Sequence, residues 1–191
     1  GNDEIYGERS GVNIYGGPDV LFGGPGNDYI NGNLGADALW GGEGFDELEG
    51  GPDRDYLNGG GGNDILRGEG DEDYLTGGPG DDALWGDSGD DVLYGNTGND
   101  KLNGESGDDW LFGNEDNDFL RGGSGDDRVW GHEGNDRLCG NGGDDDLSGS
   151  SGDDTCLGGG FIGGGTDTEH SCEVEASSSD CTESAFNNWS P

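Results

Sequence analysis

Aspartate has the most regular spacing of any residue that could do chemistry in this chain. From Gly23 to Gly149 a glycine begins every nine-residue unit, and the sixth residue of each unit is an aspartate. Asp19 fits the same position in an irregular unit upstream. Carboxylates are ligands for hard divalent cations such as Ca²⁺. The candidate metal ligands are therefore Asp19, Asp28, Asp37, Asp46, Asp55, Asp64, Asp73, Asp82, Asp91, Asp100, Asp109, Asp118, Asp127, Asp136, Asp145 and Asp154.

The same nine-residue register predicts the elements that position these carboxylates. The eighth residue of each unit is apolar, from Ile30 through the leucines to Cys156. Since side chains alternate along a strand, a stretch such as Ala83-Leu84-Trp85 predicts a three-residue strand with Leu84 inward. A glycine-rich six-residue turn separates successive strands. Two units form one coil, and stacked coils give an all-β, parallel β-roll with two facing sheets.

Stacking places each aspartate beside the aspartate two units away, about 5 Å apart, in one ladder along each edge of the roll. Such rows of like charge need cations between them. Ca²⁺ accepts about 6 to 8 oxygens from carboxylates and backbone carbonyls. We expect on the order of 14 Ca²⁺ ions, which would offset most of the net charge of −37. The small core, with one inward residue per unit, predicts that the metal-free chain is largely unfolded.

The nine-residue repeat resembles that of a known family. Residues 77–85 (Gly-Gly-Pro-Gly-Asp-Asp-Ala-Leu-Trp) and 122–130 (Gly-Gly-Ser-Gly-Asp-Asp-Arg-Val-Trp) resemble the RTX (repeats-in-toxin) nonapeptide of hemolysin-type calcium-binding proteins. The resemblance covers about residues 1–157. It implies a right-handed β-roll that folds with calcium and is attached to secreted toxins, proteases, lipases or adhesins.

Outward residues of one predicted sheet are aromatic along most of its length. A partner, whether a protein, a polysaccharide or a second copy of the chain, could dock there. Alternatively, the rings only stiffen the sheet. Ice binding is disfavoured because regular threonine ranks are absent. The candidate partner-binding residues are Phe22, Trp40, Tyr56, Tyr74, Tyr94, Trp110, Phe112 and Trp130.

The repeat register ends at Gly158, and we interpret residues 158–191 as a capping segment, with a secretion or anchoring signal as the alternative. Four cysteines in a secreted chain predict two disulfides. Cys156 is expected inward and Cys139 outward, which disfavours a bond between them. We expect Cys156 to pair with Cys172 and Cys139 with Cys181.

Other function classes are disfavoured. The acidic charge repels nucleic acid, and no apolar run is long enough to span a membrane. His132 and His170 lie in no nucleophile motif, so we expect a protein that is not an enzyme. The sequence thus predicts a secreted calcium-binding repeat protein. The alternatives are a calcium-triggered folding module of a larger secreted toxin, hydrolase or adhesin, and a self-assembling structural solenoid.

Overall fold

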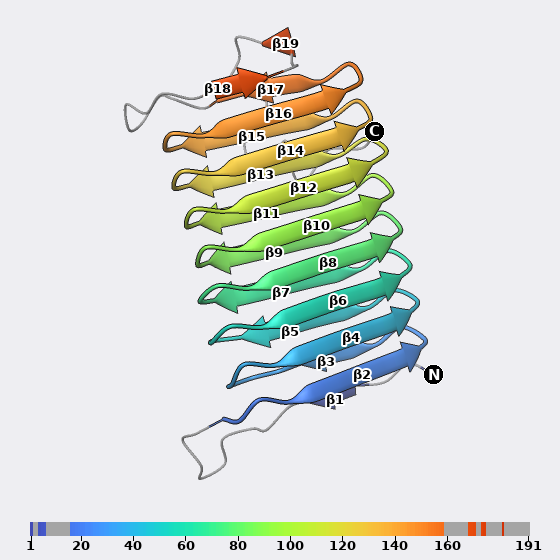
Figure 1. The fold of residues 1–191 in the computed structure, drawn as a ribbon. Coiled ribbons are helices and arrows are strands. Elements are labelled where there is room, and N and C mark those ends of the chain that lie inside the picture. The colour runs from blue at the N-terminus through green and yellow to red at the C-terminus, as the bar shows by residue number, and fades with distance from the viewer. Residues whose placement is uncertain (2–3, 7–15, 159–167, 171–172, 175–180, 182–191) are drawn as a thin grey trace.

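The chain forms a parallel β-solenoid of about eight turns, seen in a computed structural model (Figure 1). The structure describes residues 1, 4–6, 16–158, 168–170, 173–174 and 181. Within these residues no helix has the length and apolar character needed to cross a membrane. The predicted disulfide partner Cys172 lies outside the described residues.

Strands alternate between two sheets, each of which is parallel throughout. The odd sheet contains β1 (Glu4–Tyr6), β3 (Tyr29–Asn31), β5 (Glu47–Gly51), β7 (Ile65–Gly70), β9 (Ala83–Ser88), β11 (Lys101–Ser106), β13 (Phe119–Ser124), β15 (Arg137–Gly142), β17 (Thr155–Leu157) and β19 (Glu173–Val174). The even sheet contains β2 (Val20–Pro25), β4 (Ala38–Glu43), β6 (Tyr56–Gly61), β8 (Tyr74–Pro79), β10 (Val92–Thr97), β12 (Trp110–Glu115), β14 (Arg128–Glu133), β16 (Asp146–Ser151) and β18 (Thr168–His170).

The predicted coil of two units is confirmed by the strand register. Leu93 of β10 lies between Leu75 of β8 and Leu111 of β12, each two units away along the chain. The eighth-position residues from Ile30 to Cys156 are fully buried and form one continuous core between the sheets. Ile5 and Leu21 pack against this core and extend it toward the amino-terminal end. Because each coil repeats the same shape, one inward residue per strand fills the space between the sheets.

The strands are longer than the three residues predicted from sequence. β9 continues from Ala83-Leu84-Trp85 through Gly86, Asp87 and Ser88, and these last residues pair with β11. The pairing continues although Asp87 has a φ of 71°. The backbone therefore bends at the second position of a unit without leaving the sheet. The predicted six-residue turn is correspondingly shorter.

The sheets also continue beyond the end of the repeat register. β18 pairs with β16, and β19 pairs with β17, so each sheet gains a further strand after Leu157. The division of the chain into a roll at 1–157 and a cap at 158–191 stays a prediction. The added strands are consistent with a segment that covers the last coil.

A second apolar cluster lies on the outer face of the odd sheet. Phe119, Cys139, Leu157 and Cys181 are buried together there, and Trp85 packs against them. The predicted Cys139–Cys181 disulfide is confirmed, with Cα atoms 5.7 Å apart. Cys156 is also disulfide-bonded. Its expected partner, Cys172, lies outside the described residues.

Candidate metal sites

The sixth-position aspartates lie immediately before the strands, at the two edges of the solenoid. Asp82 precedes β9 and Asp91 precedes β10, so successive units place their carboxylates at opposite edges. The aspartates from Asp28 to Asp154 at this position are all buried, with at most 3 % of their surface exposed. Asp19 is half-buried. The structure thus brings the predicted ligands together in two ladders.

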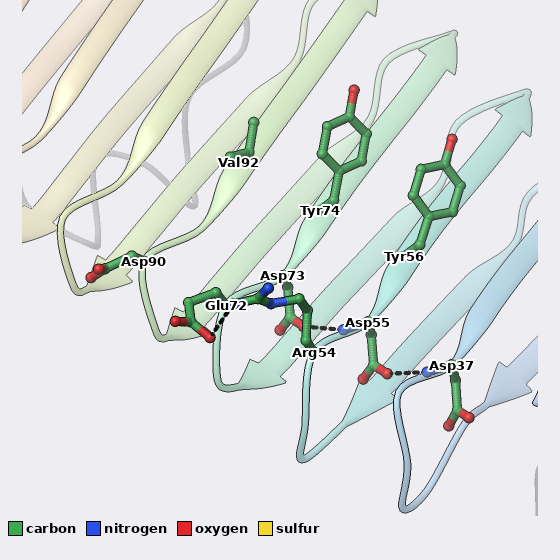
Figure 2. Close-up of a pocket in the computed structure, with 9 residues that line it drawn as sticks. All are labelled: Asp37, Arg54, Asp55, Tyr56, Glu72, Asp73, Tyr74, Asp90 and Val92. Atoms are coloured by element: carbon green, nitrogen blue, oxygen red, sulfur yellow. Dashed lines mark hydrogen bonds and ion pairs between the residues drawn. The ribbon is translucent and has the colours of Figure 1, made fainter. Parts of the chain in front are cut away.

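One oxygen of each carboxylate connects neighbouring coils. The backbone N–H of Asp37 donates to Oδ1 of Asp55, and the N–H of Asp55 donates to Oδ1 of Asp73, each over 2.7 Å (Figure 2). The same bond recurs along both edges, as from Asp100 to Asp118 at 2.8 Å. From Asp37 to Asp154, each aspartate at this position therefore accepts from the coil before it. This bond orients the carboxylate and leaves its other oxygen for another ligand.

In thirteen of these aspartates the second oxygen, Oδ2, is buried and accepts no hydrogen bond within the described part of the chain. A buried anionic oxygen without a partner is costly, and it indicates an ion or other group that the polypeptide alone does not supply. The side chains with such an oxygen are Asp37, Asp46, Asp55, Asp64, Asp73, Asp82, Asp91, Asp100, Asp109, Asp118, Asp127, Asp136 and Asp154.

A backbone carbonyl lies close to this oxygen, beside the glycine that begins each unit. A Cβ placed on Gly104 would lie 2.1 Å from Oδ2 of Asp109 and 2.7 Å from the carbonyl oxygen of Gly122. Gly86 has the same surroundings, with Oδ2 of Asp91 at 2.2 Å and the carbonyl oxygen of Gly104 at 2.9 Å. Glycine is required here because any side chain would displace the carboxylate. The space it leaves brings two oxygens together from adjacent coils.

The donor set fits a hard cation that binds oxygen. No three His, Cys, Asp or Glu side chains converge on one point in the described residues. An ion between coils must therefore combine few carboxylates with backbone carbonyls. Ca²⁺ binds carboxylate and carbonyl oxygens together and tolerates variable geometry, whereas protein Zn²⁺ sites are built mainly from Cys and His ligands, which these edges lack.

Burial opposes the ionised form of these aspartates when no cation is present. Burial, together with the charges of neighbouring Asp100 and Asp136, raises the pKa of Asp118 to about 9, although a backbone hydrogen bond acts to lower it. The same causes raise the pKa of Asp82 and Asp127 to about 8. At neutral pH a metal-free roll must therefore bury carboxylates that resist ionisation. A cation between the coils removes this penalty.

A second ladder at the fifth position was not predicted from the sequence. The N–H of Asp108 donates to Oδ1 of Asp90 over 2.9 Å, and the N–H of Asp126 donates to Oδ1 of Asp108 over 2.8 Å. Here each side chain accepts from the coil after it, opposite to the sixth position. The sequence feature that could have indicated this ladder is the Asn or Asp that precedes most of the sixth-position aspartates, as in Asp81-Asp82. These exposed bonds connect coils without a metal.

The predicted aromatic face lies on the outer surface of the even sheet. Its rings form an unbroken contact series across the coils. Phe22 stacks on Trp40 at 4.9 Å, and Tyr94 stacks on Phe112 at 4.6 Å. His132 of β14 also stacks on Phe112, with ring centroids 6.1 Å apart. This stacking supports the prediction that the rings stiffen the sheet, and it leaves their role in docking a partner as a proposal.

Comparison with known families agrees with this geometry. The model of the RTX calcium-binding nonapeptide repeat matches residues 13–48, 49–84, 85–120, 112–147 and 140–163. The chain belongs to the RTX repeat family. Membership implies a calcium-binding, structural and non-catalytic repeat, and RTX repeat proteins are typically secreted. No curated protein matches the chain as a relative.

Proposed function

We propose that this RTX chain is an extracellular protein that folds when Ca²⁺ binds between its coils, with on the order of 14 ions in two rows. The observation that supports this most strongly is the series of buried Oδ2 atoms without a hydrogen bond. The arrangement recurs at both edges in successive coils of the described roll. The metal is thus a structural component of the whole roll.

The sixth-position aspartates, together with carbonyls of the first-position glycines, would hold the ions. Bound Ca²⁺ supplies positive charge between carboxylates that otherwise repel each other and resist burial. The chain itself orients those carboxylates through the Oδ1 hydrogen bonds, as at Asp55 and Asp73. Since few residues are inward, ordering the chain depends on this charge compensation.

An extracellular location fits both the disulfide and the metal. The Cys139–Cys181 disulfide requires an oxidising environment to form and persist. Extracellular calcium sites operate with dissociation constants of about 10⁻⁴ to 10⁻³ M, at which cytosolic calcium would leave them empty. The roll would then stay unfolded until it meets external calcium.

A calcium titration followed by far-UV circular dichroism tests the proposal, with magnesium as the control cation and a count of bound ions. We expect a cooperative gain of strand signal with on the order of a dozen ions bound, and no comparable gain with magnesium. A strand signal that is already complete in chelator would contradict calcium-dependent folding.

A further inference from the structure

The outer face of the even sheet is free of charge over most of its length, although the chain carries 44 acidic residues. From β2 to β12 the first, third and fifth residues of each strand point outward and none of them is charged, whereas the exposed Glu43 and Glu115 lie at the ends of β4 and β12. The outward residues in this stretch are Val20, Phe22, Gly24, Ala38, Trp40, Gly42, Tyr56, Asn58, Gly60, Tyr74, Thr76, Gly78, Val92, Tyr94, Asn96, Trp110, Phe112 and Asn114. The odd sheet, in contrast, presents Glu47, Glu49, Arg67, Asp87 and Lys101 outward.

This uncharged face also holds the apolar side chains that are most exposed. Val20, Phe22, Trp110 and Tyr74 expose 63 %, 61 %, 44 % and 39 % of their surfaces. Of the large apolar side chains exposed in the described residues, only Phe45 lies elsewhere. A contiguous apolar surface on a highly charged protein indicates an interaction site.

The ring geometry restricts what can cover the face. Tyr56 and Tyr74 are stacked 8° from parallel at 5.3 Å, and Phe112 and Trp130 are stacked 6° from parallel at 4.8 Å. Their faces therefore cover one another along the solenoid, and ring edges point outward. A sugar ring binds an aromatic residue through the ring face, so a polysaccharide would find few faces available. A corrugated row of ring edges suits another apolar sheet better.

We propose that this face binds a second copy of the chain, giving a calcium-dependent homodimer with the two even sheets packed face to face. The inference rests on the proposed calcium-dependent folding. Two copies with a charge of −37 each repel, and the uncharged face is where they can approach with least desolvation of charge. In a two-fold symmetric dimer the same surface of both copies forms the interface, so an uncharged face can pair with itself.

The size of the face sets the expected affinity. The six strands of the uncharged stretch, β2 to β12, at about 4.8 Å spacing and five residues wide, give a face of about 29 Å by about 16 Å. Both copies together would bury about 900 Å², which is in the range of weak, transient interfaces. The dimer is therefore weak, with a dissociation constant in the micromolar range or above. It forms only after Ca²⁺ has neutralised the aspartate ladders at the two edges of each roll.

Sedimentation velocity in calcium tests this, from about 5 µM to about 500 µM chain. We expect a reversible monomer–dimer equilibrium. Val92→Lys places a charge on the face in both copies and should raise the dissociation constant at least about tenfold. Ile65→Lys makes a matched change on the outer face of the odd sheet and should leave it unaltered. Circular dichroism in calcium confirms that each variant is folded.

Three outcomes would overturn the dimer. Wild-type protein that is folded in calcium but monomeric throughout would refute the dimer and leave the proposed function intact. Equal weakening by Val92→Lys and Ile65→Lys would place the contact elsewhere. Binding of the folded monomer to insoluble cellulose, chitin or phosphatidylcholine vesicles, lost in Val92→Lys, would assign the face to sugar or lipid. A chain that stays unfolded in calcium would instead refute the proposed function itself.

Discussion

Replacing one buried sixth-position aspartate by asparagine should have opposite effects with and without calcium. Asp109 is fully buried, and its Oδ1 accepts the N–H of Asp91 over 2.8 Å. An asparagine in its place would keep this hydrogen bond and lose only the negative charge at Oδ2. The Asp109→Asn variant therefore separates the metal ligand from the structural hydrogen bond.

The expected magnitude follows from the position of Asp109 in its ladder. Its own N–H donates to Oδ1 of Asp127, so the residue borders the gap before it and the gap after it. An ion present at 100 times its dissociation constant adds about 2.7 kcal/mol to the free energy of unfolding. Loss of one or two ions in Asp109→Asn should thus lower that free energy by about 3 to 5 kcal/mol in calcium.

Without calcium the sign reverses. Burial raises the pKa of the Asp109 carboxyl to about 7, so at pH 8 the metal-free roll must bury an anion that Asp109→Asn removes. In chelator, with trimethylamine oxide added to favour burial, the variant should fold at a lower osmolyte concentration than wild type.

The matched control is Asp108→Asn, which changes the net charge equally at the neighbouring, exposed fifth position. Its Oδ1 accepts from Asp126, and asparagine keeps that bond. Urea unfolding in calcium and osmolyte-induced folding in chelator, both followed by circular dichroism, should show only small changes for this control. Equal effects of the two variants, or destabilisation of Asp109→Asn in chelator as well, would refute the role assigned to Oδ2.

The remaining predictions concern packing, pH and the disulfide. Gly104→Ala would place a Cβ 2.1 Å from Oδ2 of Asp109 and should lower the free energy of unfolding in calcium by about 1 to 3 kcal/mol or more. Gly70→Ala, whose Cβ meets nothing closer than 3.8 Å, should change it by less than about 0.5 kcal/mol in the same urea titration. Buried aspartates such as Asp118 have a higher pKa in the roll than in the unfolded chain, so the metal-free roll binds more protons and gains stability as pH falls from about 9 toward about 4. Circular dichroism in chelator should then show more strand at pH 4.5 than at pH 8. In a calcium titration, acid should raise the calcium concentration at the folding midpoint. Less strand in chelator at pH 4.5 than at pH 8 would contradict the inference that burial raises these pKa values. The Cys139–Cys181 disulfide joins residues that are 42 apart in the sequence. Replacing both cysteines by serine should lower the free energy of unfolding in calcium by up to about 4 kcal/mol and so lower the urea midpoint. An unchanged midpoint would mean that the disulfide does not stabilise the roll.

The repeat made most of the fold predictable. Because every coil is a translated copy, the spacing of Leu84 and Leu102 alone indicates both the stacking direction and the core. The burial of Asp82 and Asp100 follows from the same spacing. In such a sequence the contacts between coils can be read from the repeat spacing, because each residue lies beside the residue at the same position two units away.

Features that depend on contacts outside the register were not predictable in the same way. Phe119 looks like an outward residue of a polar face, but it is buried in one cluster with Cys139, Leu157 and Cys181. The extension of β9 through Asp87 requires a positive φ within a strand, which the turn-rich composition concealed. The fifth-position ladder resembled ordinary solvated carboxylates, because its bonds run between backbone N–H groups and side chains of different coils.

The alternation of units between two sheets limits how such a chain can change its length. Removal of two consecutive units takes out one whole coil and leaves every later side chain on its original face. Removal of a single unit would preserve the spacing of aspartate and leucine but transfer all later outward residues to the opposite sheet. A one-unit deletion between Tyr74 and Tyr94, for example, would separate Phe112 and Trp130 from Tyr74 and interrupt the aromatic series. The metal ladders therefore tolerate changes of one repeat, whereas the uncharged face permits only changes of two.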